Sequence, residues 1–140
     1  MRRLALSLVA LLFLAGPAPA EGFVLRTTTQ MLAQPLAFIF EGQAEVSALL
    51  GAGTDPHTYQ PTRLDVRSMV EADAVTYHGL LFEAQLLDLM QQLKQRLPAL
   101  AAEAYQPAED LLRDGGLPDP HTWHNPVLWI ETVVGLSRAL

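Results

Sequence analysis

Short β-prone runs alternate with amphipathic helical runs along the chain, and this alternation limits the possible folds more than any other feature of the sequence. The β-prone runs are Phe23–Thr28, Glu45–Leu50, Asp73–Tyr77 and a weaker one at Ala99–Tyr105. Apolar residues recur at helical spacing over Met31–Glu41, Thr62–Ala72, Phe82–Leu97 and Pro126–Leu140. Strands that alternate with helices form βαβ units. We therefore expect an α/β fold in which helices flank a three- to four-stranded parallel sheet.

Residues that begin or end helices support these ranges. Thr62 is a suitable N-cap for the second helix, and Pro126 suits the first turn of the last one. Pro35 is expected in the first turn of the first helix, where its missing N–H costs no hydrogen bond. Pro98 is expected to stop the third, leucine-rich helix.

The first twenty residues have the pattern of a secretory signal peptide. Arg2 and Arg3 provide a positive start, Leu4–Gly16 is apolar, and Ala18-Pro19-Ala20 is a small-residue cleavage site. We expect cleavage after Ala20 and export to the periplasm. The alternative is an N-terminal membrane anchor, but the apolar run is short for a bilayer.

Composition narrows the possible functions. The 140 residues include no cysteine, which excludes disulfides, thiolate metal ligands and a lipid anchor attached to cysteine. The formal net charge of −6 argues against nucleic acid as a partner and favours cations or neutral ligands.

The sequence Asp-Pro-His-Thr followed by an aromatic residue occurs twice, around His57 and around His121. A histidine in a loop is most often solvated or bonded locally, but here the context favours a metal ligand. The proline stiffens each loop. Tyr59 or Trp123 can bury its ring and hold the loop in place. A neutral imidazole on such a loop suits Zn²⁺, Mn²⁺ or Fe²⁺.

The two loops are expected to share one rim of the sheet with His78. The first motif follows a strand end, His78 follows another, and the second motif precedes the last helix. Ligands of open α/β sheets bind at the carboxyl ends of the strands. Asp55 and Asp119 would either orient the imidazoles or cap their own turns, and capping is the favoured role.

Two imidazoles do not complete a metal site, since zinc prefers four ligands. The further candidates are His78, Glu83 and His124. Each has an ordinary alternative: His124 would face solvent, and Glu83 would cap or pair on its helix.

Four stretches together are similar to one known family. They are RTTTQMLA (Arg26–Ala33), EVSALLGAGTDPHTYQPTRLDV (Glu45–Val66), EADAVTYHGLLFE (Glu71–Glu83) and DPHTWHNPVLW (Asp119–Trp129). The chain resembles the periplasmic metal-binding proteins of zinc and manganese ABC transporters, which deliver Zn²⁺, Mn²⁺ or Fe²⁺ to an inner-membrane permease. The resemblance implies that His57 and His121 ligate the metal as transported cargo, with no organic cofactor and no catalysis.

The resemblance also implies the domain organisation. Family members have two α/β lobes joined by a long helix, and the second lobe supplies the remaining ligands. We expect a signal peptide at 1–20, an N-terminal metal-binding lobe at 21–125 and the start of the linking helix at 126–140, with the C-terminal lobe absent. The open face between lobes would then favour self-association.

Some positions depart from the family pattern. His78 stands where Asn is common, and His124-Asn125 replaces an apolar residue and Asp. The histidine-rich loop of many zinc-specific members is missing, which leans toward manganese or a broad divalent specificity. Two alternatives to a transport protein stay open: a fragment that binds nothing, and a small metallohydrolase lobe, although no HExxH spacing is present.

Overall fold

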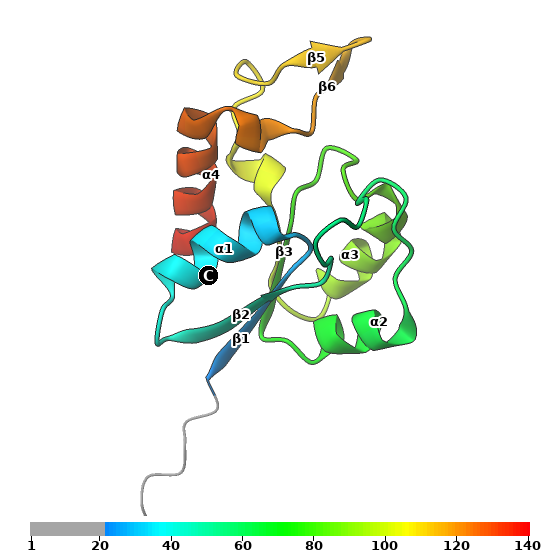
Figure 1. Cartoon of the computed structure of the whole chain (residues 1–140), viewed down its shortest axis with the longest axis vertical. Coiled ribbons are helices and arrows are strands. Elements are labelled where there is room, and N and C mark those ends of the chain that lie inside the picture. Colours follow the sequence, from blue (N-terminus) through cyan, green and yellow to red (C-terminus); the bar gives the residue numbers. More distant parts are fainter. Residues whose placement is uncertain (1–21) are drawn as a thin grey trace, which may run out of the picture.

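A computed structural model describes residues 22–140, so the predicted signal peptide lies outside the described residues. Its centre is a parallel sheet in the order β2-β1-β3-β4 (Figure 1). The strands are β1 (Phe23–Thr27), β2 (Ala44–Ala48), β3 (Ala74–Tyr77) and β4 (Ala99–Ala101). The predicted α/β fold with a parallel sheet flanked by helices is therefore confirmed, with four strands.

The strand order reverses next to β1. The chain runs from β1 to β2 on one side and then returns past β1 to β3 on the other. The register aligns the carboxyl ends, because Thr27 pairs with both Ala48 and Thr76, and Tyr77 pairs with Ala101. Such a reversal separates the loops that leave the two central strands and creates the crevice where α/β sheets bind ligands.

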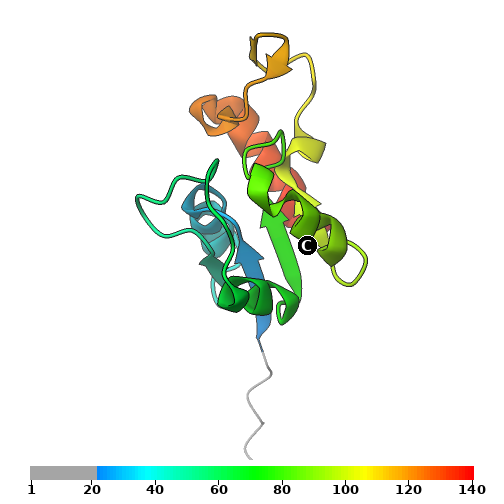
Figure 2. The same cartoon turned by 90° about the vertical axis from the view of Figure 1, so that its right-hand side faces the viewer.

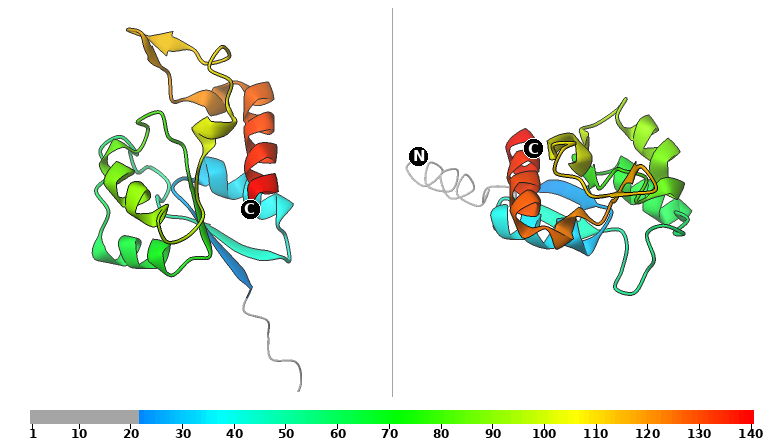
Figure 3. Two further views of the ribbon diagram at one scale, coloured as in Figure 1. Left: turned by 180° about the vertical axis from the view of Figure 1, so that it is seen from behind. Right: turned by 90° about the horizontal axis from the view of Figure 1, so that it is seen from above.

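Helices cover both faces of the sheet. They are α1 (Gln30–Ile39), α2 (Arg63–Val70), α3 (Leu87–Leu93) and α4 (Pro126–Ala139). Helices α1 and α4 pack together on one face, and α2 and α3 lie on the other (Figures 1 and 3). None of the helices in residues 22–140 has the length and apolar content needed to cross a bilayer.

The two-residue alternation of the strands builds two separate cores. Val24 and Val75 point toward α2 and α3, whereas their neighbours Leu25 and Ala74 point toward α1 and α4. The first core, on the α2 and α3 face, contains Leu50, Met69, Ala72, Val75, Tyr77, Leu86, Met90, Leu93, Ala99 and Ala101. The second core, on the α1 and α4 face, contains Leu25, Leu32, Leu36, Ala74, Ala102, Val133 and Leu136.

The predicted helix caps are present. The Thr62 hydroxyl accepts a hydrogen bond from the Asp65 N–H, and the Asp65 carboxylate accepts one from the Thr62 N–H. This is a reciprocal capping box. Pro126 occupies the first turn of α4, and the Asn125 side chain caps that helix by accepting from the Leu128 N–H.

Three local predictions were wrong. Pro35 is the sixth residue of α1, because the helix begins at Gln30, and its missing N–H removes the bond to the Met31 carbonyl. The third helix is much shorter than Phe82–Leu97: a 3₁₀ turn at Ala84–Leu86 precedes α3, which ends at Leu93.

The fourth strand is also shorter than predicted. It stops at Ala101 and continues as a 3₁₀ turn, Ala102–Tyr105. The segment that follows contains a hairpin of β5 (Arg113–Asp114) and β6 (Leu117–Pro118), which extends away from the sheet (Figure 2). Gly115 and Gly116 both have positive φ, as a two-residue hairpin turn requires.

Candidate metal centre

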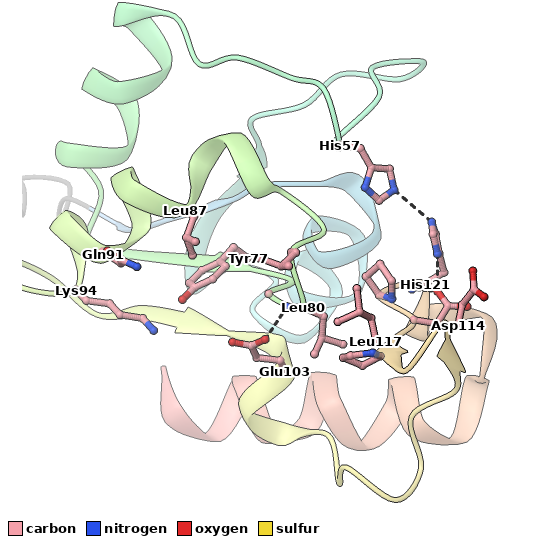
Figure 4. A pocket seen from close by; sticks show the side chains of 15 residues that line it. His57, Tyr77, Leu80, Leu87, Gln91, Lys94, Glu103, Asp114, Leu117 and His121 are labelled. Atoms are coloured by element: carbon pink, nitrogen blue, oxygen red, sulfur yellow. Dashed lines mark hydrogen bonds and ion pairs between the residues drawn. The ribbon is translucent and has the colours of Figure 1, made fainter.

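The two Asp-Pro-His-Thr loops meet, although 64 residues separate their histidines. Nε2 of His57 lies 3.4 Å from Nε2 of His121, and both side chains are exposed (Figure 4). His57 comes from the loop between β2 and α2, and His121 comes from the loop after β6. Both imidazoles line one cleft of about 850 Å³, which runs along α3 and the β5–β6 hairpin. The nitrogens that would face a metal are therefore accessible from solvent.

The aspartates of the two motifs cap their own turns, as predicted. Asp55 accepts from the His57 N–H at 3.0 Å, and Asp119 accepts from the His121 N–H at 3.0 Å. Asp119 also lies 2.6 Å from Nδ1 of His121, and these contacts lower the pKa of Asp119. A proton on Nδ1 of His121 would leave its Nε2 free to accept a metal. Asp119 thus caps its own turn, and its carboxylate is also placed where it could orient the His121 ring.

The aromatic residues of the motifs hold the loops to the body of the protein. The Tyr59 ring packs against the first core, and its hydroxyl donates to Asp65 at 2.6 Å. This hydrogen bond, with burial, raises the pKa of Tyr59 to about 12, so the donor stays protonated. The Trp123 ring lies 5.0 Å from the Phe82 ring and 5.2 Å from the His78 ring.

Phe82 forms the floor beneath the histidine pair. Its side chain is 2% exposed. Its ring meets the His57 ring edge-on at 4.9 Å and the His121 ring edge-on at 5.6 Å between centroids. The same ring contacts His78 at 4.6 Å. Phe82 therefore lies between the exposed pair and a group of buried polar residues. The sequence contains no motif that would have identified this role.

His78 belongs to that buried group. Nε2 of His78 lies 2.7 Å from the Thr29 hydroxyl, and its ring stacks on Trp129 at 5.5 Å. Its Nδ1 is buried and has no hydrogen-bond partner among the described residues. Burial, with a smaller effect from nearby His121, lowers the pKa of His78 to about 3. His78 is thus a neutral, enclosed imidazole near physiological pH.

Glu83 is the second ionisable member of the buried group. Its Oε1 accepts from the Thr28 hydroxyl at 2.5 Å and from the His78 N–H at 3.0 Å, and its Oε2 accepts from the Gly79 N–H at 3.4 Å. Burial raises the pKa of Glu83, and these hydrogen bonds oppose the shift. Both carboxylate oxygens already have protein donors. The carboxylate also links the end of β1 to the chain that leaves β3.

The chain between His78 and Phe82 adopts an unusual left-handed turn. Gly79, Leu80 and Leu81 have φ values of 82°, 51° and 60°, and the Phe82 N–H closes the turn on the Gly79 carbonyl. For residues with a Cβ this region costs roughly 1–2 kcal/mol each. The Leu80 N–H donates to Glu103 at 2.6 Å.

The structure does not bring the remaining candidate ligands together with the histidine pair. His78 and Glu83 are only 3% and 5% exposed. The His78 ring contacts the Phe82 ring, and the Glu83 carboxylate accepts from the His78 N–H. His124 is exposed and packs beside Trp123. Within residues 22–140, no three His, Cys, Asp or Glu side chains form a group able to hold a metal ion. The described chain offers two imidazoles at one point.

Comparison with known proteins gives the family. The model of a family described as "zinc-uptake complex component A, periplasmic" matches residues 26–140. The chain belongs to this family of periplasmic zinc-uptake components. It is 33% identical over 122 residues to the manganese-binding lipoprotein MntA of Bacillus subtilis. It is 31% identical over 125 residues to the zinc-binding protein TroA of Treponema pallidum.

The structural comparison agrees with this zinc-uptake family. The periplasmic zinc-binding protein TroA from Treponema pallidum superposes with a TM-score of 0.80 at 28% identity, over 84% of this chain and 43% of that one. The sequence alignments cover 85% and 88% of this chain but only 40% of MntA and 41% of TroA. The chain therefore spans well under half the length of these relatives and matches one lobe of such a protein.

Proposed function

We propose that His57 and His121 together bind a divalent transition metal, which this protein carries as cargo. The observation that supports this most is the 3.4 Å separation of two exposed Nε2 atoms from segments far apart in the sequence. The relatives named for zinc or manganese binding support the same chemistry. Binding is the whole function, with no reaction catalysed.

The distance between the nitrogens is compatible with one zinc ion bound by both. With Zn–N bonds of about 2.0–2.1 Å, nitrogens 3.4 Å apart subtend about 110° at the metal, close to the tetrahedral angle. Imidazole ligands bind zinc more tightly than manganese in the Irving–Williams order. We therefore expect a preference for zinc, whereas the missing histidine-rich loop leaned toward manganese or a broad divalent specificity.

Binding requires both imidazoles to present a bare Nε2. Asp119 is placed to keep the His121 proton on Nδ1. In the metal-free protein, His57 can donate its Nε2 proton to His121 across the 3.4 Å gap. When a metal binds there, the single proton of neutral His57 moves to its Nδ1. A charged imidazolium would have to lose a proton first, so zinc binding should weaken as pH falls.

We further propose that the protein is exported to the periplasm and delivers its metal to an ABC permease. The family description and the signal-peptide pattern of residues 1–20 support this assignment. Two protein ligands leave the other coordination positions to water, so binding by this chain alone should be weak. A second copy that associated next to the histidine pair would add ligands and tighten the binding.

The test is calorimetry of the metal-free chain with Zn²⁺ and with Mn²⁺. We expect zinc to bind more tightly than manganese, and His57→Ala and His121→Ala each to remove most of the zinc signal. His124→Ala is the matched control, because it removes an exposed histidine near the pair. Unchanged zinc uptake in the His57→Ala/His121→Ala double variant would refute the assignment. No uptake by the wild-type chain would identify a fragment that binds nothing.

A further inference from the structure

We propose that Glu83 is a positioning residue for the metal pair: it holds the left-handed turn at Gly79–Leu81 and so places the Phe82 ring beneath His57 and His121. This inference rests on the proposed function, since it assigns Glu83 a role in metal affinity. It makes no use of Glu83 as a ligand.

The Phe82 ring contacts both histidines of the pair. The Phe82 ring makes a T-shaped contact with both imidazoles, with centroid distances of 4.9 Å for His57 and 5.6 Å for His121. The two histidines sit on separate exposed loops. A buried ring that touches both limits how each imidazole can rotate, and a site held in its binding geometry loses less entropy when it binds.

The left-handed turn at Gly79–Leu81 sets the position of Phe82. Three successive positive φ values aim the chain so that Phe82 is buried while Leu81 is 62% exposed. Leucine does not favour this conformation, so the surrounding structure has to impose it. Glycine is favoured at the first position, because its φ is 82°, a backbone conformation that residues with a Cβ rarely adopt.

Hydrogen bonds to Glu83 hold the chain in this turn. Glu83 accepts from the backbone N–H groups of His78 and Gly79 and from the hydroxyl of Thr28, which directly follows β1. Because Glu83 is 5% exposed, water cannot replace these bonds readily. Glu103 accepts from the Leu80 N–H but is exposed, so its contribution should be smaller.

The experiment measures zinc affinity and local structure in the full chain. We expect Glu83→Ala to weaken zinc binding at least tenfold in protein that circular dichroism shows to be folded. Glu83→Gln should stay within about threefold of the wild type, because its amide oxygen can keep the Oε1 bonds to Thr28 and His78. Glu131→Ala, on the exposed face of α4, is the control and should bind normally.

A second variant keeps the test decisive if Glu83→Ala does not fold. Phe82→Leu leaves Glu83 intact, tests the placement of the ring directly, and should cause a similar loss of affinity. Where Glu83→Ala does fold, the Phe82→Leu/Glu83→Ala double variant should bind zinc no more weakly than the weaker-binding single variant. Nuclear Overhauser contacts from the Phe82 ring to the His57 and His121 rings should be present in metal-free wild type and lost in Glu83→Ala.

The outcomes separate this inference from the proposed function. If zinc binding depends on His57 and His121 but neither Glu83→Ala nor Phe82→Leu weakens it, the positioning role is wrong and the function stands. If the wild type binds no zinc, the Overhauser contacts still decide the structural step. Contacts that persist in Glu83→Ala would overturn the inference, as would a variant that is merely less stable with unchanged affinity.

Discussion

The stability of the metal-free protein should fall between pH 7.5 and pH 5 because of one enclosed residue, His78. Its pKa is about 3 in the folded state, where burial disfavours the charged imidazole. In the unfolded chain the pKa returns to about 6.5. Below that value the unfolded state takes up a proton that the folded state excludes, so stability is lost as pH falls from 6.5 toward 3.

The size of the effect follows from proton linkage. With pKa values of about 6.5 and about 3, protonation of unfolded His78 lowers the free energy of unfolding by about 2 kcal/mol at pH 5. Glu83 works in the opposite direction, because burial raises its pKa and its contribution is greatest at low pH and lost as pH rises. A variant that removes only His78 therefore isolates its share.

The assay is urea denaturation followed by far-ultraviolet circular dichroism, with EDTA, at pH 7.5 and pH 5. Between pH 7.5 and pH 5, we expect the free energy of unfolding to fall by about 2 kcal/mol less in His78→Asn than in the wild type. His124→Asn makes the same substitution at an exposed position and should keep the wild-type pH dependence. Equal losses in wild type and His78→Asn would show that the buried imidazole does not control the acid sensitivity.

Three further predictions concern local structure, and urea denaturation checks all of them. Thr62→Ala should lower the free energy of unfolding by about 1 kcal/mol, because the capping box with Asp65 is lost. An unchanged stability would show that the capping box does not stabilise α2. Gly135→Ala should destabilise by about 1–3 kcal/mol, since the new Cβ would lie 2.5 Å from the Tyr105 ring, whereas helix propensity alone predicts a gain. Gly79→Ala should lower the free energy of unfolding by about 1 kcal/mol, because its φ is 82°, and a neutral result would contradict the left-handed turn.

Much of the fold could be predicted because hydrophobic periodicity reports on local burial. The strand runs, the Thr62 cap and the Pro126 start of α4 all depend on neighbours within a few residues. The meeting of the two histidine loops also followed from a general rule, since both lie at the rim where parallel strands end. Their measured separation of 3.4 Å required the structure.

The parts that sequence reasoning missed depend on contacts far along the chain. Leucine spacing extended the third helix back to Phe82, but the turn before it is fixed by Glu83 and by Thr28 from β1. At the C-terminal end of α3, Pro98 disfavours helical backbone at the residue before it, Leu97. The helix therefore ends before Leu97, at Leu93, although the leucine spacing continues to Leu97. The buried state of His78 follows from packing against Trp129, on a helix about 50 residues later.

The separation of the hydrophobic interior into two cores has a consequence for folding cooperativity. The loop of His57 is attached through Tyr59 to the first core, and the segment after His121 is attached through Trp129 to the second. A metal held by both imidazoles would act as a cross-link between the two layers on opposite faces of the sheet. Its binding energy would be lost when either layer opened. Zinc should then slow amide hydrogen exchange in α2 and α4 together, so that two layers able to fluctuate separately would open as one unit.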